Sequence, residues 1–206
     1  MQQVSPVGLR GQHVRLEPLT REHTAGLVAA AVGGSRETFA LTHVPADRAE
    51  METYVDSALE DQRHGRAVPF ATVCDGRVVG STRFGNIERW SWPPGAPAQR
   101  PAGCADAVEI GWTWLTPAAQ RTAVNTEAKL LMLAHAFEVW EVVRVTLKTD
   151  ARNARSRAAI ERIGGRLDGL LRGHMPAYDG TVRTSAVYSI LAEEWPEVAK
   201  ALRARL

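Results

Sequence analysis

The feature that most constrains the fold is a strand pattern that passes through a short polar loop into a helical pattern. AVEIGWTWL, residues 107–115, is rich in strand-forming residues, and LLMLAHAFEVW, residues 130–140, has helical character. QRTAVNTEAK, residues 120–129, lies between them. We therefore expect a strand at Val108–Leu115 and a helix at Thr126–Trp140. The backbone N–H groups at such a helix N-terminus, aided by the helix dipole, attract anions, although the simpler interpretation of this loop alone is a well-capped turn.

The rest of the chain alternates between strand and helix patterns, and their order predicts a mixed sheet. We expect strands at 14–16, 68–74, 77–84, 143–149, 166–175 and 182–191, and helices at 21–32, 47–64, 154–163 and 193–206. Asp75-Gly76 between two apolar runs is a strong hairpin signal, and Gly164-Gly165 stops a helix. This order indicates the fold class α/β, with helices on the faces of the sheet. The first half has too few strands to close a sheet alone, so we expect a single domain over residues 1–206.

A long loop rich in Pro, Gly and Ala follows the second strand of that hairpin. It reads ERWSWPPGAPAQRPAGCAD, residues 88–106. A loop of this length inside a compact domain is often functional or mobile. Trp90 and Trp92 lie in it, and exposed aromatic side chains more often indicate binding than packing. The tryptophans that we expect in the core are Trp112, Trp114, Trp140 and Trp195.

Composition narrows the functional classes. The formal net charge is +2 and no long basic stretch is present, so nucleic acid is not expected as a partner. Cys74 and Cys104 cannot form a disulfide framework and fit a reducing compartment. Neither has a cysteine or histidine nearby at metal spacing, so no metal is expected. No apolar run has the length of a membrane span and the first residues lack a signal-peptide core, so we expect a cytoplasmic protein without a membrane partner.

Glu109 is the candidate catalytic residue on the strand before the loop. Strand alternation puts one set of side chains on each face, namely Glu109, Gly111, Thr113 and Leu115 against Ile110, Trp112 and Trp114. A carboxylate among apolar strand neighbours would be partly desolvated, which makes it a better base. A glutamate that points into water from an edge strand is the equally weighted alternative.

A second strand–helix junction lies at TDARNARSRAAIERIGG, residues 149–165. Asn153 fits a helix cap, with Ser156 three residues further on. Both junctions lie at strand C-termini, where open α/β sheets bind their ligands. Asn153 and Ser156 are therefore either part of a helix cap alone or part of a cap that also faces a ligand.

The order of these elements resembles the GNAT superfamily of acetyl-CoA-dependent N-acetyltransferases. The family's loop motif is Gln/Arg-x-x-Gly-x-Gly/Ala, and its defined positions are occupied here by Gln120, Ala123 and Asn125. Glu109 matches the spacing of the family's catalytic glutamate, and Asn153 matches its helix-start asparagine. GLRGQHVRLEPL, RTAVNTEAK and ARNARSRAAIERIGG are most similar to the RimJ/RimL-type branch, which includes protein N-terminal acetyltransferases. The resemblance implies a mostly antiparallel central sheet flanked by helices on both faces.

Two departures from the family pattern bear on the site. Ala123 and Asn125 replace both loop glycines; alanine adds little bulk, and asparagine adopts a positive φ more readily than most residues. Ile160 replaces the family tyrosine that protonates the departing CoA thiolate. Ser156, the nearest hydroxyl, is our substitute for this general acid. Tyr188 on the last strand is a weaker candidate that suits the core.

The resemblance implies acetyl-CoA as a co-substrate and no metal. The loop and helix N-terminus would hold the CoA pyrophosphate, and Glu109 would take a proton from the acceptor ammonium. The implied cofactor-binding residues are Leu115, Gln120, Arg121, Thr122, Ala123, Val124, Asn125, Thr126, Asn153 and Ser156. The resemblance also puts His174 of the last hairpin on the acceptor side, where a lone histidine is otherwise structural or solvated. With Trp90 and Trp92, expected from the long loop, it completes the predicted acceptor-binding residues.

The identity of the acceptor stays open at this point. A peptide or protein N-terminus and a small-molecule amine both fit, and a homodimer is a further open expectation. A non-catalytic module that binds acyl-CoA as a sensor is the alternative function, because the loop glycines are absent. A base at Glu109 separates the two, since a sensor has no need for one.

Overall fold

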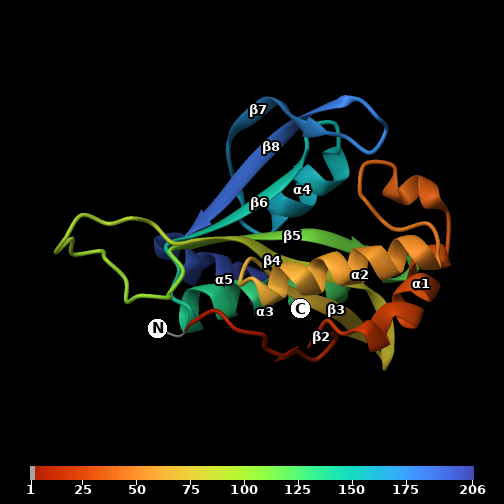
Figure 1. Ribbon diagram of the computed structural model, residues 1–206, viewed down its shortest axis with the longest axis horizontal. Helices are drawn as coiled ribbons and strands as arrows, with labels where there is room; N and C mark the ends of the chain where they lie inside the picture. The colour runs from red at the N-terminus through yellow and green to blue at the C-terminus, as the bar shows by residue number, and fades with distance from the viewer. Residues whose placement is uncertain (1–2) are drawn as a thin grey trace.

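An eight-stranded sheet in the order β1-β2-β3-β4-β5-β6-β8-β7 forms the centre of the computed structural model, which describes residues 3–206 (Figure 1). The strands are β1 (Leu9–Arg10), β2 (Arg15–Pro18), β3 (Val68–Cys74), β4 (Arg77–Glu88), β5 (Ala107–Leu115), β6 (Arg144–Asp150), β7 (Arg166–Pro176) and β8 (Val182–Leu191). Neighbouring strands of this sheet are antiparallel except β5 and β6, which run parallel. The expected α/β class with a mixed, mostly antiparallel sheet is therefore confirmed.

Helices cover both faces of the sheet, but unevenly. They are α1 (Thr24–Val32), α2 (Arg48–Arg63), α3 (Ala123–Ala134), α4 (Ala154–Arg162) and α5 (Trp195–Arg203). Short 3₁₀ turns cover Arg21–His23, Arg36–Phe39, Pro117–Ala119 and Ala192–Glu194, and a π-helical turn, His135–Val139, continues α3. Apolar side chains of α3, α4 and α5 pack on one face. α1 and α2 pack on the other face over β3, β4 and the end of β5.

Most element boundaries follow the sequence, and the exceptions have local causes. The β3–β4 hairpin turns at the expected Asp-Gly pair, whose φ angles are 49° and 74°. β1 was not predicted, because two residues are too few to show a pattern. α3 begins at Ala123 rather than at Thr126, because Thr122 caps it: its Oγ1 accepts the Val124 N–H at 3.3 Å. The end of the predicted loop is therefore the first helical turn, whose N–H groups have no partner within the helix.

A β-bulge in β5 changes which side chains share a face. Trp112 and Thr113 together oppose Thr82 of β4, and Trp112 has a left-handed φ of 50°. The extra residue reverses the alternation of β5, so that Trp114 packs on the α1–α2 face and Thr113 turns toward α3. The unbroken alternation predicted for β5 is therefore wrong after Gly111. Trp112 is 42% exposed and not in the core. The other tryptophans expected in the core are buried, namely Trp114, Trp140 and Trp195.

The same part of β5 leaves its parallel neighbour. β5 and β6 pair only at Ala107–Glu109 with Arg144–Thr146, although β5 continues to Leu115 and β6 to Asp150. Beyond the last pair, the facing edges of both strands carry backbone N–H and C=O groups that the sheet ladder does not use. The strands diverge toward their C-terminal ends, where the connections to α3 and α4 begin.

α3 places a lysine in the core beneath the bulge. Lys129 is 5% exposed, and its Nζ donates to Thr113 Oγ1 at 2.6 Å and to Thr82 Oγ1 at 3.1 Å. Burial lowers the pKa of Lys129 to about 7, because the charged form loses its hydration. A buried amine of this kind destabilises the fold at every pH below the ordinary lysine pKa, and the destabilisation is greatest below the lowered pKa, where the folded chain must hold the charged form.

We predict that Lys129→Met raises the free energy of unfolding and that the gain depends on pH. Between about pH 7 and the ordinary lysine pKa of 10.5, the unfolded chain binds a proton that the folded chain does not. The stability of the wild type therefore rises with pH across this window. Below pH 7, the free energy of unfolding of the wild type is lower than that of the variant by on the order of 5 kcal/mol, less the contribution of the hydrogen bonds that the variant loses. This difference in free energy shrinks toward pH 10.

Urea unfolding at about pH 6, 8 and 10 measures this difference. Lys200→Met changes an exposed lysine of α5 and is the matched control. Equal pH slopes in the two variants would contradict the prediction.

Candidate active site

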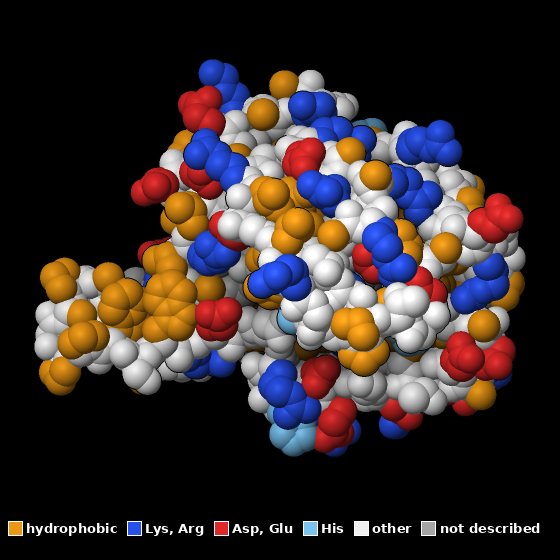
Figure 2. Space-filling view, turned by 90° about the horizontal axis from the view of Figure 1, so that it is seen from above, with side chains coloured by type: hydrophobic (Ala, Val, Ile, Leu, Met, Phe, Trp, Pro, Cys, Tyr) orange, Lys and Arg blue, Asp and Glu red, His pale blue; other side chains and the backbone are white. Residues whose placement is uncertain are grey.

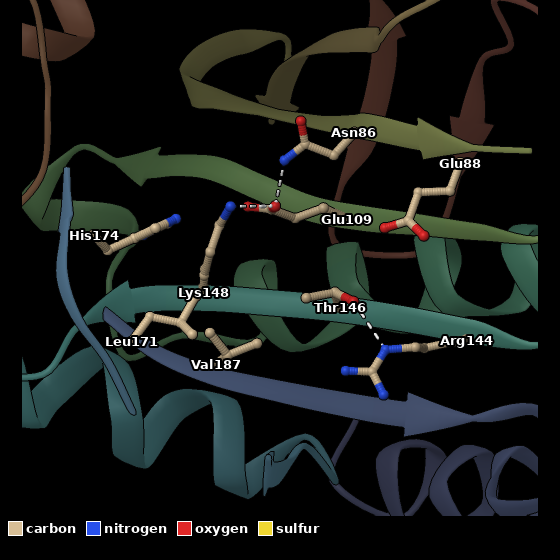
Figure 3. Close-up of a pocket in the computed structure, with 9 residues that line it drawn as sticks. All are labelled: Asn86, Glu88, Glu109, Arg144, Thr146, Lys148, Leu171, His174 and Val187. Carbon is tan, nitrogen blue, oxygen red and sulfur yellow. Dashed lines mark hydrogen bonds and ion pairs between the residues drawn. The ribbon is translucent and has the colours of Figure 1, made fainter. Parts of the chain in front are cut away.

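A pocket of about 310 Å³ opens on the same face of the sheet as α1 and α2, in the part that these helices do not cover. It lies beside the divergence of β5 and β6 (Figure 3). Its lining residues are Asn86, Glu88, Glu109, Arg144, Thr146, Lys148, Leu171, His174 and Val187. Most of this lining is polar or charged. The pocket brings together Glu109 and His174, which lie on strands far apart in the sequence.

Glu109 lies in the middle of this lining and is 6% exposed. Its Oε2 accepts a hydrogen bond from Asn86 Nδ2 at 2.6 Å and forms an ion pair with Lys148 Nζ at 2.9 Å (Figure 3). A glutamate on an edge strand, pointing into water, is therefore the wrong alternative. The apolar surroundings expected for this carboxylate are also wrong, because its immediate partners are an amide and an ammonium group.

Strands β4 and β6 each place a side chain in contact with Glu109. In β4, a bulge beside Glu109 gives Asn86 a left-handed φ of 43° and turns its amide onto the carboxylate. β6 is regular, so alternation puts Arg144, Thr146 and Lys148 on the pocket face. Neither Asn86 nor Lys148 was predicted from the sequence. The alternation of β6 is the signal that would have found Lys148.

His174 reaches the pocket from β7. The register of β7 against β8 jumps between Leu171 and Met175, and Gly173 in this bulge has a φ of 58°. The bulge turns His174 over β8, where its Nδ1 lies 2.9 Å from Ser185 Oγ. His174 therefore faces Glu109 and Lys148 across the pocket (Figure 3), and its role there stays a prediction.

The connections that lead into α3 and α4 meet at the C-terminal ends of β5 and β6. Arg155 of α4 donates to Gln120 Oε1 at 3.4 Å and to Thr38 Oγ1 at 2.8 Å. These bonds link α4 to the connection before α3 and to the turn after α1. Gln120 Nε2 also donates to the Leu115 carbonyl at 2.9 Å. The two junctions that the sequence predicted to share a ligand are thus neighbours, and Arg155, which joins them, was not predicted.

The connection before α3 differs from expectation in its backbone. The left-handed φ, 61°, belongs to Arg121 and not to Asn125, which lies in the first turn of α3. The other predicted cofactor-binding residues of this segment differ in exposure. Thr122 is exposed, Gln120 and Ala123 are half-buried, and Leu115, Val124 and Thr126 are buried. The N–H groups of this first turn remain the natural position for an anion.

Asn153 caps α4, as both interpretations of this junction required. Its Oδ1 accepts the Ser156 N–H at 3.0 Å. Ser156 is half-buried, and neither residue lines the Glu109 pocket. Tyr188 is fully buried, and its hydroxyl accepts from Arg157 Nε at 2.9 Å and donates to Glu161 Oε1 at 3.0 Å. Tyr188 is therefore a core tyrosine with a satisfied hydroxyl, and Ser156 is the better candidate for the general acid.

An aromatic group beside the bulge was also missed from the sequence. Arg83 of β4 is 4% exposed, and its guanidinium lies 5.1 Å from the Tyr54 ring and 5.0 Å from the Trp112 ring. His43, before α2, stacks on Tyr178 of the β7–β8 turn with ring centroids 4.7 Å apart. These residues come from five separate segments, so no sequence pattern marks them as one cluster.

The loop between β4 and β5 projects from the body of the molecule (Figure 1), and hydrophobic side chains gather on it (Figure 2). Trp90 is 40% exposed, and its ring centroid lies 5.6 Å from that of Trp92. Both are fixed at the base of the loop, because the Trp90 N–H and Trp92 Nε1 donate to Asp106 at 2.7 and 2.8 Å. Trp90 Nε1 donates to Glu88 at 2.8 Å. The pair therefore adjoins the Glu88 end of the pocket without lining it.

Two further findings concern other kinds of site. Within residues 3–206, no three or more His, Cys, Asp or Glu side chains are grouped so as to hold a metal ion. In the same part of the chain, no helix has the length and apolar character that crossing a membrane requires. The expectation of a reaction without a metal stays a prediction.

The chain is similar to known acetyltransferases in sequence and in fold. The model of the acetyltransferase (GNAT) domain family matches residues 13–166. A GCN5-related N-acetyltransferase from Brucella melitensis matches at 30% identity and a TM-score of 0.82, over 98% of this chain and 86% of that one. Among curated proteins, none matches.

Two structures at lower identity share the fold. Mycobacterium smegmatis RimJ, in complex with CoA-disulfide, matches at 22% identity and a TM-score of 0.77, over 97% of this chain and 93% of that one. RimL, a ribosomal L7/L12 alpha-N-protein acetyltransferase in complex with coenzyme A, matches at 16% identity and a TM-score of 0.72, over 91% of this chain and 99% of that one.

We predict that Trp90→Ala or Trp92→Ala raises the KM for the acceptor amine by about 10-fold, or ~1.4 kcal/mol. Acetyl-CoA affinity should change little, because the pair adjoins the Glu88 end of the pocket and not the N-terminus of α3. Steady-state kinetics and calorimetry measure the two quantities. Trp92→Phe keeps an aromatic ring but removes the N–H that donates to Asp106, and so separates the ring contact from the hydrogen bond that fixes the side chain. Equal loss of both affinities would instead give the pair a role in the fold alone.

Proposed function

The chain belongs to the GNAT acetyltransferase family, and from this membership we propose that it moves the acetyl group of acetyl-CoA to a primary amine bound in the Glu109 pocket. The observation that carries the proposal is Glu109 itself. It is a buried carboxylate, fixed by Lys148 and Asn86, that faces a pocket where β5 and β6 diverge. A module that only binds acyl-CoA as a sensor has no need for such a group.

The chemical groups of acetyl-CoA match the groups that the chain presents where β5 and β6 diverge. Its pyrophosphate suits the first turn of α3, where the N–H groups of Ala123–Asn125 point out of the N-terminal end of the helix. Arg121 and Arg155 add positive charge near this end. The pantetheine amides find partners in the unpaired strand edges and in the Asn153 side chain. RimJ and RimL, which share this fold, were solved with forms of CoA bound.

Glu109 acts as the general base in this proposal. The acceptor is an ammonium ion near neutral pH, and it must lose a proton before its lone pair attacks the thioester carbon. Glu109 accepts that proton, directly or through a water molecule, while Lys148 and Asn86 keep the carboxylate oriented. His174 lies on the opposite side of the pocket and contacts the acceptor.

The thioester oxygen gains negative charge as the amine attacks. Unpaired backbone N–H groups of β5, between the bulge and Leu115, stabilise this charge. When the C–S bond breaks, the CoA thiolate takes the proton of the Ser156 hydroxyl, and that hydroxyl is restored from the proton that the new amide nitrogen loses. The products are an N-acetyl amide and CoA thiol.

The acceptor is the primary amine of a protein N-terminus or of a small molecule. The pocket of about 310 Å³ holds two carboxylates, Glu88 and Glu109, and two cations, Arg144 and Lys148. Lys148 pairs with Glu109, so Glu88 is the carboxylate that we assign to the ammonium group of the acceptor as it enters. The unpaired thiols of Cys74 and Cys104 support a cytoplasmic site of action. A homodimer is part of the proposal and is testable by light scattering.

We predict that acetyl-CoA binds without any acceptor and that Asn153→Ala or Asn125→Pro weakens this binding about 10-fold. Proline is tolerated in the first helical turn, so Asn125→Pro removes one N–H group and keeps α3. Ala49→Pro makes the same change in the first turn of α2 and is the matched control. Asn153→Asp retains the cap of α4 and separates capping from ligand contact.

Isothermal calorimetry measures each affinity. Absence of both heat and thermal shift at ~1 mM acetyl-CoA, the weak end of useful affinity, would refute the CoA site.

We predict that Glu109→Gln lowers kcat by ~10²–10⁴-fold, the usual effect of losing a positioned base. The amide keeps the shape of the side chain and removes its charge, so acetyl-CoA affinity should be retained. Activity should recover partly at high pH, where free amine accumulates. Glu88→Gln removes a second carboxylate from the same pocket and should have a much smaller effect on kcat.

Steady-state kinetics over a pH series test this prediction. Near-normal kcat at neutral pH would pass the role of base to His174 or to a water molecule. A variant that neither folds nor binds CoA would make Glu109 structural.

A further inference from the structure

Lys129 is a buried amine to which the proposed reaction gives no role. Its Nζ closes a triangle with two hydroxyls, at 2.6 Å from Thr113 Oγ1 and 3.1 Å from Thr82 Oγ1, which are themselves 2.8 Å apart. Both hydroxyls also lie 3.4 Å from the Gly111 carbonyl oxygen. The triangle therefore ties α3 to the residue before the β5 bulge, to the bulge itself and to the strand opposite.

The position of Lys129 favours an apolar side chain on packing grounds. Ala128, Met132 and Leu133 of the same helix are buried around it, and Met132 Sδ lies 3.7 Å from Thr82 Oγ1. Among the described residues, no carboxylate forms an ion pair with Lys129. A residue that breaks a local packing rule without a compensating charge partner is expected at functional positions.

The bulge needs support because a regular alternative exists. Arg83 pairs with Gly111 and Ser81 with Trp114, so one residue of β4 faces two of β5. A slip of one residue on either side would restore regular pairing and exchange the faces of the side chains. Hydrogen bonds from the single Lys129 amine to Thr113 of β5 and to Thr82 of β4 favour the bulged register.

We propose that Lys129 is a positioning residue of the acetyl site: by holding Thr113 and Thr82 it fixes the β5 bulge, and with it the backbone N–H groups that face the thioester oxygen. This inference rests on the proposed function, because it assigns those N–H groups to the acetyl group of acetyl-CoA. Lys129 acts through Thr113 and does not touch the substrate.

Two single variants and their combination test the proposal. Lys129→Met and Thr113→Val each remove the contact between the two residues, and each should lower kcat by about 10- to 100-fold, below the ~10²–10³ of a direct oxyanion donor. The affinity for CoA, which has no acetyl carbonyl, should stay within about two-fold of the wild type. The double variant should fall no further than the single variants, because both remove one coupling.

Stability provides a second readout that a merely structural role would not reproduce. Lys129→Met should raise the Tm, because it removes a buried amine. Thr113→Val should lower the Tm, because it leaves that amine with one partner fewer. Loss of kcat in both variants would then be independent of stability. Leu133→Met, a volume-conserving change at a core position one turn further along α3, should keep kcat and is the control.

Three results would each overturn the inference. They are a Lys129→Met kcat within about two-fold of the wild type, additive losses in the double variant, and loss of CoA affinity in parallel with kcat. A wild type that releases no thiol from acetyl-CoA with any of a panel of amines and peptides would overturn the proposed function and this inference with it. An active wild type with an unaffected Lys129→Met variant overturns this inference alone.

Discussion

The divergence of β5 from β6 is the constraint on which the rest of the site depends. Parallel pairing ends at Glu109 and Thr146, and three residues later the bulge at Trp112 bends β5 further from its neighbour. Glu109 therefore lies at the last paired rung, where the strands are still close enough for its carboxylate to reach Lys148. Beyond that rung, backbone groups lose their strand partner and become available to a ligand. One irregularity thus positions both the carboxylate that we propose as the base and the strand edge that we propose for the acyl group.

Ionisable groups surround this irregularity on both faces, and each has its own partners. Glu109 has an ion pair and an amide, and Lys129 has two hydroxyls. Arg83 has an ion pair with Asp61 at 3.7 Å and lies close to two aromatic rings. Buried charges rarely add net stability over apolar residues of the same size. Their concentration around one bulge supports the proposed site in this part of the sheet, and the apolar clusters under the helices on both faces offset their cost.

Regular segments with clear ends could be predicted from the sequence, and irregular ones could not. The hairpins and α4 follow from alternation and helical periodicity bounded by Asp-Gly and Gly-Gly. The β5 bulge could not be predicted from the sequence. Large apolar residues occupy both faces of β5, so an extra residue causes no visible break in the alternation. Glu109 was predicted from its strand and from the family resemblance, and the structure places it in the pocket. Its partners Asn86 and Lys148 were missed, because they come from other strands and depend on pairing register.

The missing loop glycines are explained by where the helix begins. Thr122 caps α3, so Ala123 and Asn125 have ordinary helical backbone and need no glycine. The positive φ falls on Arg121, where a residue other than glycine costs roughly 1–2 kcal/mol. Neighbouring bonds hold this conformation, among them the one from Gln120 to the Leu115 carbonyl. The pyrophosphate site that we propose therefore rests on the N–H groups and dipole of α3, which the substitutions leave intact, and not on glycine itself.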